Sequence, residues 1–179
     1  MTSFYSETEL QAMGFKSIGV GCKISRFARF YGVSKMSIGD NVRIDDFCIL
    51  SGNITIGSNI HISAYVALYG SLGITLEDYT GISPRSTVYS AMDDFSGDYL
   101  IGPIHDESKT NVTGGHVYIK KYAQIGCNSV LFPNIVIGEG AIVGASSMVK
   151  NSIDGWSVYA GVPAVCIKKR KNGLLNFVE

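Results

Sequence analysis

Aliphatic residues recur every six positions along the C-terminal half of the chain, and this spacing constrains the fold more than any other feature. The residues concerned are Ile119, Ile125, Leu131, Ile137, Val143 and Val149. A period of six matches neither a helix of about 3.6 residues per turn nor a simple alternating strand. It matches a chain that turns a corner every six residues, so that three hexads make one triangular coil and successive coils stack. The sequence therefore predicts a β-solenoid built from hexapeptide repeats.

The same register occurs in the first half of the chain, with a slip of two residues at 70–73. The repeated positions there are Ile38, Ile44, Ile56, Ile62, Leu68, Leu76, Ile82 and Val88. Ordinary short strands of a β-sandwich, the alternative, would alternate with period two and vary in spacing. We therefore expect an all-β solenoid domain over residues 18–163, with one long loop excursion at 94–118 where the register is interrupted.

Both ends of the chain carry signals for short helices. Ser6 followed by Glu9 is a capping box, which predicts an N-terminal helical cap over residues 1–17 that closes the first coil. At the other end, the sequence AVCIKKRKNG after Pro163 predicts a final turn of helix. This turn would belong to a C-terminal helix and tail over residues 164–179.

Composition indicates a compact single domain with no strong electrostatic field. Hydrophobic residues make up 46% of the chain and charged residues 17%, and 15 basic residues balance 15 acidic ones. This balance argues against nucleic acid as a partner. No apolar run is long enough to span a bilayer, and no signal peptide is recognisable. The four cysteines are far apart and predict free thiols in the cytoplasm: Cys22, Cys48, Cys127 and Cys166.

The hexads, the interrupting loop and the ending AGVPAVCIKKRK together resemble the hexapeptide-repeat acyltransferases, which have a left-handed parallel β-helix. The closest similarity is to the branch of galactoside, maltose and xenobiotic acetyltransferases, and it covers about residues 18–171. The resemblance implies a homotrimer that binds acetyl-CoA in a groove between adjacent subunits, where a sugar acceptor meets it. It also implies that the excursion carries part of the active site and that no metal is needed.

The resemblance places the cofactor along the corners of the late coils. The corner Ile125-Gly126-Cys127-Asn128 would present the main-chain N–H of Cys127 as the oxyanion donor. A Cys127 thiol nucleophile is the competing interpretation, although no histidine adjoins it in the sequence. Small corner residues would admit the cofactor to the backbone, Pro163 would shape the adenine end, and two lysines would meet the 3′-phosphate. The full predicted set is Gly126, Cys127, Gly144, Ala145, Ser146, Gly161, Pro163, Lys168 and Lys169.

The predicted catalytic residues depart from the family pattern. Relatives in this branch have a histidine after the third coil, and Asp93 occupies that position here. A carboxylate is a weak base unless burial or a like-charged neighbour such as Asp94 raises its pKa, and adjacent acids on a loop are equally a solvated pair. His61 lies on a coil with its ring predicted to project outward, so it is the first candidate base. His105 in the excursion and His116 where the register resumes are the other histidines.

An amine acceptor would reduce the need for a base, because an unprotonated sugar amine attacks a thioester readily. The replacement of the histidine therefore favours an amino-sugar N-acetyltransferase, with glycoside O-acetylation as the alternative. Surface polysaccharide is the expected destination of the product, by family resemblance. Asp93 and Asp94 would orient the acceptor, and aromatic residues would stack on the sugar or anchor the loop: Tyr65, Tyr69, Tyr89, Phe95 and Tyr99.

Three other functions are compatible with the repeat itself. A xenobiotic (antibiotic) O-acetyltransferase is the nearest alternative, although such enzymes usually carry the loop histidine. A γ-type carbonic anhydrase needs three imidazoles around zinc, and the three histidines here lack that spacing. A non-catalytic solenoid would need neither the long excursion nor the AGVPA ending.

Overall fold

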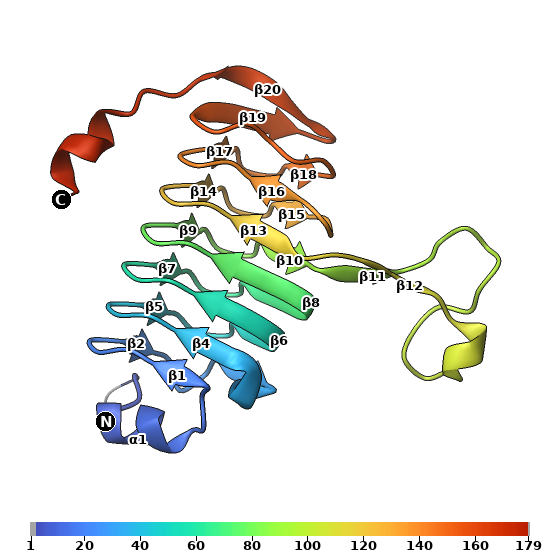
Figure 1. Ribbon diagram of the computed structural model, residues 1–179, viewed down its shortest axis with the longest axis horizontal. Helices are drawn as coiled ribbons and strands as arrows, with labels where there is room; N and C mark the ends of the chain where they lie inside the picture. Colours follow the sequence, from blue (N-terminus) through green and yellow to red (C-terminus); the bar gives the residue numbers. More distant parts are fainter. Residues whose placement is uncertain (1–2, 179) are drawn as a thin grey trace.

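The chain folds as a left-handed parallel β-helix, in which short parallel strands stack along one axis (Figure 1). The computed structural model describes residues 3–178, so residues 1–2 of the predicted cap and residue 179 of the predicted tail lie outside it. Sheet register stacks one aliphatic residue of each coil on the next: Ile18, Ile38, Ile56, Leu76, Ile119, Ile137 and Ile153. The predicted hexapeptide solenoid is confirmed.

The solenoid has three faces, which we number in chain order. The first face contains β1 (Ser17–Ile18), β4 (Met36–Ile38), the second halves of β6 (Ile49–Ile56) and β8 (Ala67–Leu76), β13 (Val117–Ile119) and β16 (Val136–Ile137). The second face contains β2 (Lys23–Ile24), β5 (Arg43–Ile44), β7 (His61–Ile62), β9 (Gly81–Ile82), β14 (Gln124–Ile125), β17 (Ile142–Val143) and β19 (Ser157–Gly161). The third face contains β3 (Arg29–Tyr31), the first halves of β6 and β8, β10 (Thr87–Tyr89), β15 (Val130–Leu131) and β18 (Met148–Val149).

The hexad residues form the core of the prism. Ile62, Leu68 and Ile125 have no solvent exposure, and they pack in one continuous apolar cluster with their counterparts in other coils. Burial of one such side chain stabilises a fold by about 1.5–3 kcal/mol. The six-residue period is therefore the direct consequence of one inward-facing side chain on each face.

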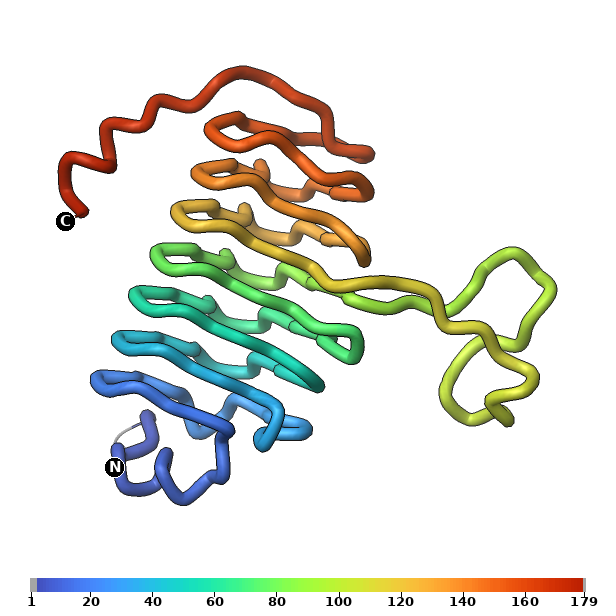
Figure 2. The backbone as a smooth tube through the Cα atoms, in the orientation of Figure 1, coloured from blue at the N-terminus to red at the C-terminus, as the bar shows by residue number. Residues whose placement is uncertain are grey.

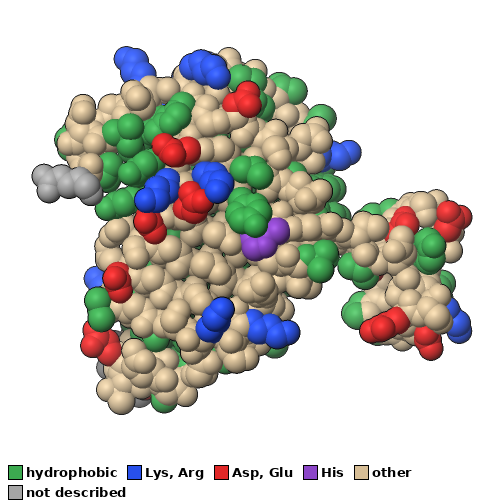
Figure 3. Space-filling view, viewed as in Figure 1, with side chains coloured by type: hydrophobic (Ala, Val, Ile, Leu, Met, Phe, Trp, Pro, Cys, Tyr) green, Lys and Arg blue, Asp and Glu red, His purple; other side chains and the backbone are tan. Residues whose placement is uncertain are grey.

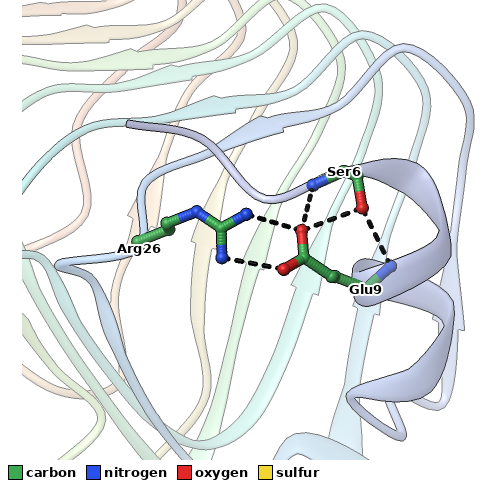
Figure 4. A network of polar contacts seen from close by, with 3 residues as sticks. All are labelled: Ser6, Glu9 and Arg26. Carbon is green, nitrogen blue, oxygen red and sulfur yellow. Dashed lines mark hydrogen bonds and ion pairs between the residues drawn. The ribbon is translucent and has the colours of Figure 1, made fainter. Parts of the chain in front are cut away.

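The N-terminal cap is the short helix α1 (Glu7–Ala12), which covers the open end of the first coil (Figure 4). Glu9 accepts a hydrogen bond from the Ser6 backbone N–H at 2.7 Å, and the Ser6 hydroxyl oxygen accepts one from the Glu9 N–H at 3.3 Å. Arg26 donates both terminal guanidinium nitrogens to the Glu9 carboxylate at 2.8 and 2.7 Å. Leu10 is buried against the first coil. The predicted capping box is confirmed, and Arg26 ties it to the solenoid.

The Glu9→Gln substitution is expected to loosen this cap at neutral pH. Hydrogen bonds from Arg26 and Ser6 lower the pKa of Glu9 from 4.5 to about 2. Because the folded-state pKa is depressed, the stabilisation is present above about pH 4.5 and is lost as the pH falls toward 2. Hydrogen–deuterium exchange of residues 6–12 should be faster in the variant at pH 7 and equal to wild type near pH 2. Glu7→Gln, in the same turn, is the control and should leave exchange unchanged; equal exchange of all three proteins at pH 7 would contradict the assignment.

The excursion is a hairpin that projects away from the prism (Figures 1 and 2). Its stem pairs β11 (Ala91–Asp93) antiparallel with β12 (Val112–Gly114), and the 3-10 helix η2 (Glu107–Lys109) lies near its tip. The interruption therefore starts a few residues before the predicted 94, and the register resumes at Val117. Several large apolar side chains of the tip are exposed, and they are Phe95, Tyr99, Leu100, Ile101 and Ile104. Apolar surface of this kind in one chain is typical of a contact with another chain.

The helical turn predicted over AVCIKKRKNG is wrong for most of that segment. Ala164–Lys169 form the strand β20, which pairs antiparallel with β19 on the second face. A strand forms here because β19 offers an unpaired edge and because Val165 and Ile167 are β-branched. The helical structure of the C-terminal tail comes later, as the 3-10 helix η3 (Gly173–Phe177). A further 3-10 helix, η1 (Val33–Lys35), lies between β3 and β4.

Candidate functional site

The predicted cofactor residues of three successive coils stack on one edge of the prism, between the second and third faces. We call this edge the cofactor corner and define it as residues 126–128, 144–146 and 161–163. The Gly126 N–H donates to Val143 O at 2.8 Å, the Ser146 N–H to Cys127 O at 2.8 Å, and the Gly144 N–H to Tyr159 O at 2.7 Å. The predicted stacking of these corners is thus present in the structure.

The Cys127 backbone N–H makes no hydrogen bond within residues 3–178, which leaves it free to act as a donor. Its side chain is half-buried, and the Sγ atom has no hydrogen-bond partner in the same part of the chain. A nucleophilic thiol needs an adjacent base or cation to become a thiolate, and the structure provides none beside it. The geometry therefore favours the oxyanion-donor interpretation over the nucleophile interpretation.

Buried serines hold the cofactor corner from the inside, and sequence reasoning did not find them. Ser86 Oγ donates to Gly126 O at 2.9 Å, and Ser129 Oγ donates to Gly144 O at 3.0 Å. Ser147 Oγ accepts from the Gly161 N–H at 3.1 Å. The signal that identifies them is a serine two residues before the inward aliphatic residue of the third face, as in Ser129 and Leu131.

The two lysines predicted to meet the cofactor phosphate lie apart from the cofactor corner. Lys168 and Lys169 are at the far end of β20, opposite Val158 and Ser157, whereas Gly161 is at the near end. Lys169 Nζ donates to Ser157 Oγ at 3.1 Å. The antiparallel return of β20 carries both lysines across the width of the second face.

Asp93 lies on the stem of the hairpin, between two hollows on either side of it. The lower hollow, of about 340 Å³, is lined by Ser71, Tyr89, Ala91, Met92, Asp93, Phe95 and Val112. The upper hollow, of about 520 Å³, also contains Asp93 and is closed by Phe132, Asn134 and Lys150. The Asp93 carboxylate is half-buried and has no hydrogen-bond or ionic partner in the described chain. It is therefore available to a ligand in either hollow.

Asp94 has a different role from its neighbour. Its Oδ1 accepts the Ser96 N–H at 2.7 Å, and its Oδ2 accepts the Asn111 side-chain amide at 2.8 Å. These hydrogen bonds, that of the Ser96 backbone first, lower the pKa of Asp94. Asp94 lines the upper hollow, but both of its oxygens hold the base of the excursion together.

The aromatic residues predicted to bind the acceptor divide between two edges of the prism. Tyr69 and Tyr89 stack on each other with ring centroids 5.3 Å apart, and Tyr89 lines the lower hollow. Tyr65 lies on the opposite edge of the third face, where it stacks on Phe47 at 5.0 Å beneath the guanidinium of Arg85. The structure therefore brings Tyr69 and Tyr89 near Asp93 but not Tyr65.

His61 projects outward from the second face, as predicted, and is paired with a carboxylate. Its Nε2 lies 2.7 Å from Asp45 Oδ2, and Arg43 Nε donates to Asp45 Oδ1 at 2.7 Å. Partial burial raises the pKa of Asp45, but the hydrogen bonds from His61 and Arg43 outweigh it and lower the pKa overall. The ring of His61 is about half exposed, and it lies on the second face, whereas the hairpin leaves the edge between the third and first faces.

The other two histidines contribute less to a site. His116 Nε2 is 2.8 Å from Thr75 Oγ1 and its ring stacks on Tyr118, while burial lowers its pKa. His105 is exposed on the excursion. Within residues 3–178 no three His, Cys, Asp or Glu side chains are grouped so that they could hold a metal ion. The same residues include no helix long and apolar enough to cross a membrane.

The two halves of the candidate site lie on opposite edges of the third face. The turn at 83–85 precedes β10, and the corners 126–128 and 144–146 precede β15 and β18 on the same face, whereas the hairpin with Asp93 follows β10. A single prism therefore presents the oxyanion donor and the unpartnered carboxylate in different directions.

Comparisons with known proteins agree with the fold. The family model "Bacterial transferase hexapeptide (six repeats)" matches residues 35–70. A dTDP-4-amino-4,6-dideoxy-D-glucose acyltransferase of Escherichia coli is 42% identical over 97% of this chain and 92% of its own length. AntD, an N-acyltransferase from Bacillus cereus solved with dTDP and 3-hydroxybutyryl-CoA, is 53% identical with a TM-score of 0.97, over 99% of this chain and 95% of its own. A putative lipopolysaccharide biosynthesis O-acetyl transferase of E. coli K12, WbbJ, is 30% identical over 84% of this chain and 67% of its own length.

The repeat and these relatives define an enzyme class, the acyltransferases. The chain belongs to the hexapeptide-repeat acyltransferase family.

Proposed function

We propose that the chain transfers an acyl group, acetyl in the simplest case, from its CoA thioester to the amino group of a nucleotide-linked amino sugar. The observation that carries the proposal is the unpartnered carboxylate of Asp93 at the position where related O-acetyltransferases have a histidine. A carboxylate can hold and orient an amine, whereas a hydroxyl acceptor needs a stronger base. The relatives named for a dTDP-linked amino sugar and for N-acyl transfer support this acceptor.

The reaction would be a direct transfer in which the amine nitrogen attacks the thioester carbon. The C–N bond forms, the C–S bond breaks, and the departing CoA sulfur takes up a proton as the nitrogen loses one. Negative charge develops on the thioester oxygen, and the free N–H of Cys127 would stabilise it. Asp93 would accept a hydrogen bond from the attacking amine and keep its lone pair directed at the carbon.

Ser83 is a further candidate in this site that the sequence alone did not indicate. It lies directly below Gly126 in the stack, where its N–H donates to Ile125 O at 2.9 Å. Solved structures of the B. cereus relative include substitutions of one serine and of one aspartate, ten positions apart in that chain. Ser83 and Asp93 have the same separation here, which supports a shared role for them at the acceptor.

A homotrimer would bring the two halves of the site together. The cofactor corner of one subunit and the hairpin of the next would then face each other across a shared groove. The exposed apolar side chains of the excursion support such a contact, because Phe95, Ile101 and Ile104 each leave more than half of their surface uncovered in the single chain. The mass of the particle measured by analytical ultracentrifugation is expected to equal that of three chains.

We place this activity in the cytoplasm, in the synthesis of bacterial surface polysaccharide. The four cysteines are free thiols, which is typical of a reducing compartment. Relatives named for lipopolysaccharide biosynthesis and for a nucleotide sugar support the pathway class.

O-Acetylation of a sugar hydroxyl is the second candidate, and the His61–Asp45 pair is the observation that favours it. A histidine held by a carboxylate is the usual arrangement of a general base. The two candidates differ in what they require. Loss of His61 would abolish O-acetylation but would leave N-acylation at Asp93 largely intact.

The proposal is tested by incubating the purified chain with acetyl-CoA and dTDP-4-amino-4,6-dideoxyglucose, the acceptor named for the relatives. Thiol should be released only when both substrates are present, and the product should gain the mass of one acetyl group as an amide. Release that is independent of the sugar would count against the proposal.

A further inference from the structure

A third hollow lies below the hairpin, on the edge between the third and first faces. It has a volume of about 700 Å³ and is lined by Lys16, Ser34, Lys35, Gly52, Asn53 and Ser71. We call it the lysine hollow. Figure 3 shows basic side chains gathered at this end of the first face, on the side from which the hairpin projects.

The lysine hollow adjoins the lower hollow that contains Asp93. Ser71 lines both, so the two hollows are neighbours along this edge of the prism. Strand register places Met36, Ile54, Ile74 and Val117 in successive coils, so Lys35 lies three coils below the base of the hairpin. Three steps of about 4.8 Å give a separation of about 14 Å along the axis. A sugar ring, one phosphate and an extended lysine side chain together cover that distance.

The charge of the lysine hollow suits an anion. Both lysines are exposed, and neither forms an ion pair with any residue in the described part of the chain. The residues that line the hollow include no acidic side chain, although acids and bases are equally frequent in the whole sequence. Two unpaired lysines with hydroxyl and amide groups beside them are typical of a phosphate-binding surface.

Gly52, one of the residues that line the hollow, occupies a position where only glycine fits. Gly52 has a φ of +93°, and a Cβ there would lie 2.6 Å from Gly70 O in the next coil. Gly32 in the coil below also has a positive φ of 84°. Only glycine fits these positions without strain, and at Gly52 the backbone of the next coil occupies the place that a Cβ would take.

We propose that the lysine hollow binds the diphosphate of a nucleoside-diphosphate-linked acceptor whose sugar amine lies at Asp93. This inference rests on the proposed function and adds the part of the acceptor that is recognised away from the reacting atoms. It assigns Lys16 and Lys35 to affinity and specificity for the nucleotide, not to the chemical step. A sugar without the diphosphate would then be a poor substrate.

The test is the double variant Lys16→Gln/Lys35→Gln, with Lys23→Gln as the matched control on the second face. Calorimetric titration with dTDP should show affinity reduced about tenfold or more in the double variant and unchanged in the control, because each lost lysine removes a charge-assisted contact. Titration with thymidine, which has no phosphate, should not distinguish the three proteins. The KM for the dTDP-linked amino sugar should rise while kcat at saturation stays within about twofold.

The outcomes separate the inference from the function on which it rests. Wild-type turnover together with equal dTDP affinity in the double variant and the control would overturn the assignment of the lysine hollow and leave the function standing. Wild-type protein that neither binds dTDP nor acylates the nucleotide sugar would overturn both. Circular dichroism of each variant should match wild type, since the lysines are exposed and contribute nothing to the core.

Discussion

Replacing Asp93 by Asn is expected to lower kcat for the amino-sugar acceptor by about 10²–10³-fold, the lower part of the 10²–10⁴-fold typical of a positioned acid–base group, because Asp93 orients the amine. The substitution keeps the shape of the side chain but removes the charge that holds and orients the amine. Thiol release under saturating substrates is the measurement. Affinity for CoA should be unchanged, because Asp93 is assigned to the acceptor amine and not to the cofactor.

Asp98→Asn is the control for this variant, because Asp98 is an exposed acid on the same excursion. It removes the same charge from the same loop but lies outside both hollows beside the stem. Equal turnover of the Asp93 and Asp98 variants would remove Asp93 from the site and shift the assignment to His61.

The Gly126→Ala substitution is expected to reduce both stability and turnover. A Cβ at Gly126 would lie 2.6 Å from Ala145 N and 2.7 Å from Gly144 C, which are backbone atoms of the next coil and cannot rotate away. Forcing extra volume into a packed site usually costs about 1–3 kcal/mol, so the melting temperature should fall. The adjacent N–H of Cys127 would move with the corner, and kcat should fall by about tenfold to 10²-fold.

Gly173→Ala is the matched control, since a Cβ there meets no atom within 4 Å. Its melting temperature and turnover should equal those of wild type. If Gly126→Ala also left both unchanged, the close stacking of the cofactor corner would have no part in catalysis.

The parts of the structure that the sequence predicted are those that repeat. Burial of one aliphatic residue per hexad produced the period, so Ile119 and Ile125 predicted both the coils and the stacking of Gly126 on Gly144. The capping box at Ser6 could also be predicted, because it depends only on two residues that are three positions apart in the sequence.

The parts that the sequence did not predict depend on contacts without a period. The stem of the hairpin pairs Met92 with Thr113. No local sequence pattern predicts that pairing or the hollows beside it. Lys169 was assigned to the cofactor phosphate from the family resemblance, and no local pattern indicated the strand pairing of β20 that places its side chain at Ser157. Tyr65 and Tyr69 are only four residues apart, but Tyr65 lies at the corner before the third-face part of β8 and Tyr69 lies at its end. They are therefore on opposite edges of that face, with different aromatic partners.

The central claim, N-acylation at a site organised by Asp93, is tested most directly with a pair of acceptors that differ in one group. A dTDP-linked 4-amino-4,6-dideoxy sugar and its 4-hydroxy counterpart are compared at equal concentration with acetyl-CoA, and thiol release and product mass are followed together. The account predicts turnover of the amine and little or none of the hydroxyl sugar. Comparable or faster acetylation of the hydroxyl sugar would contradict it and would require His61, with Asp45, to act as the base.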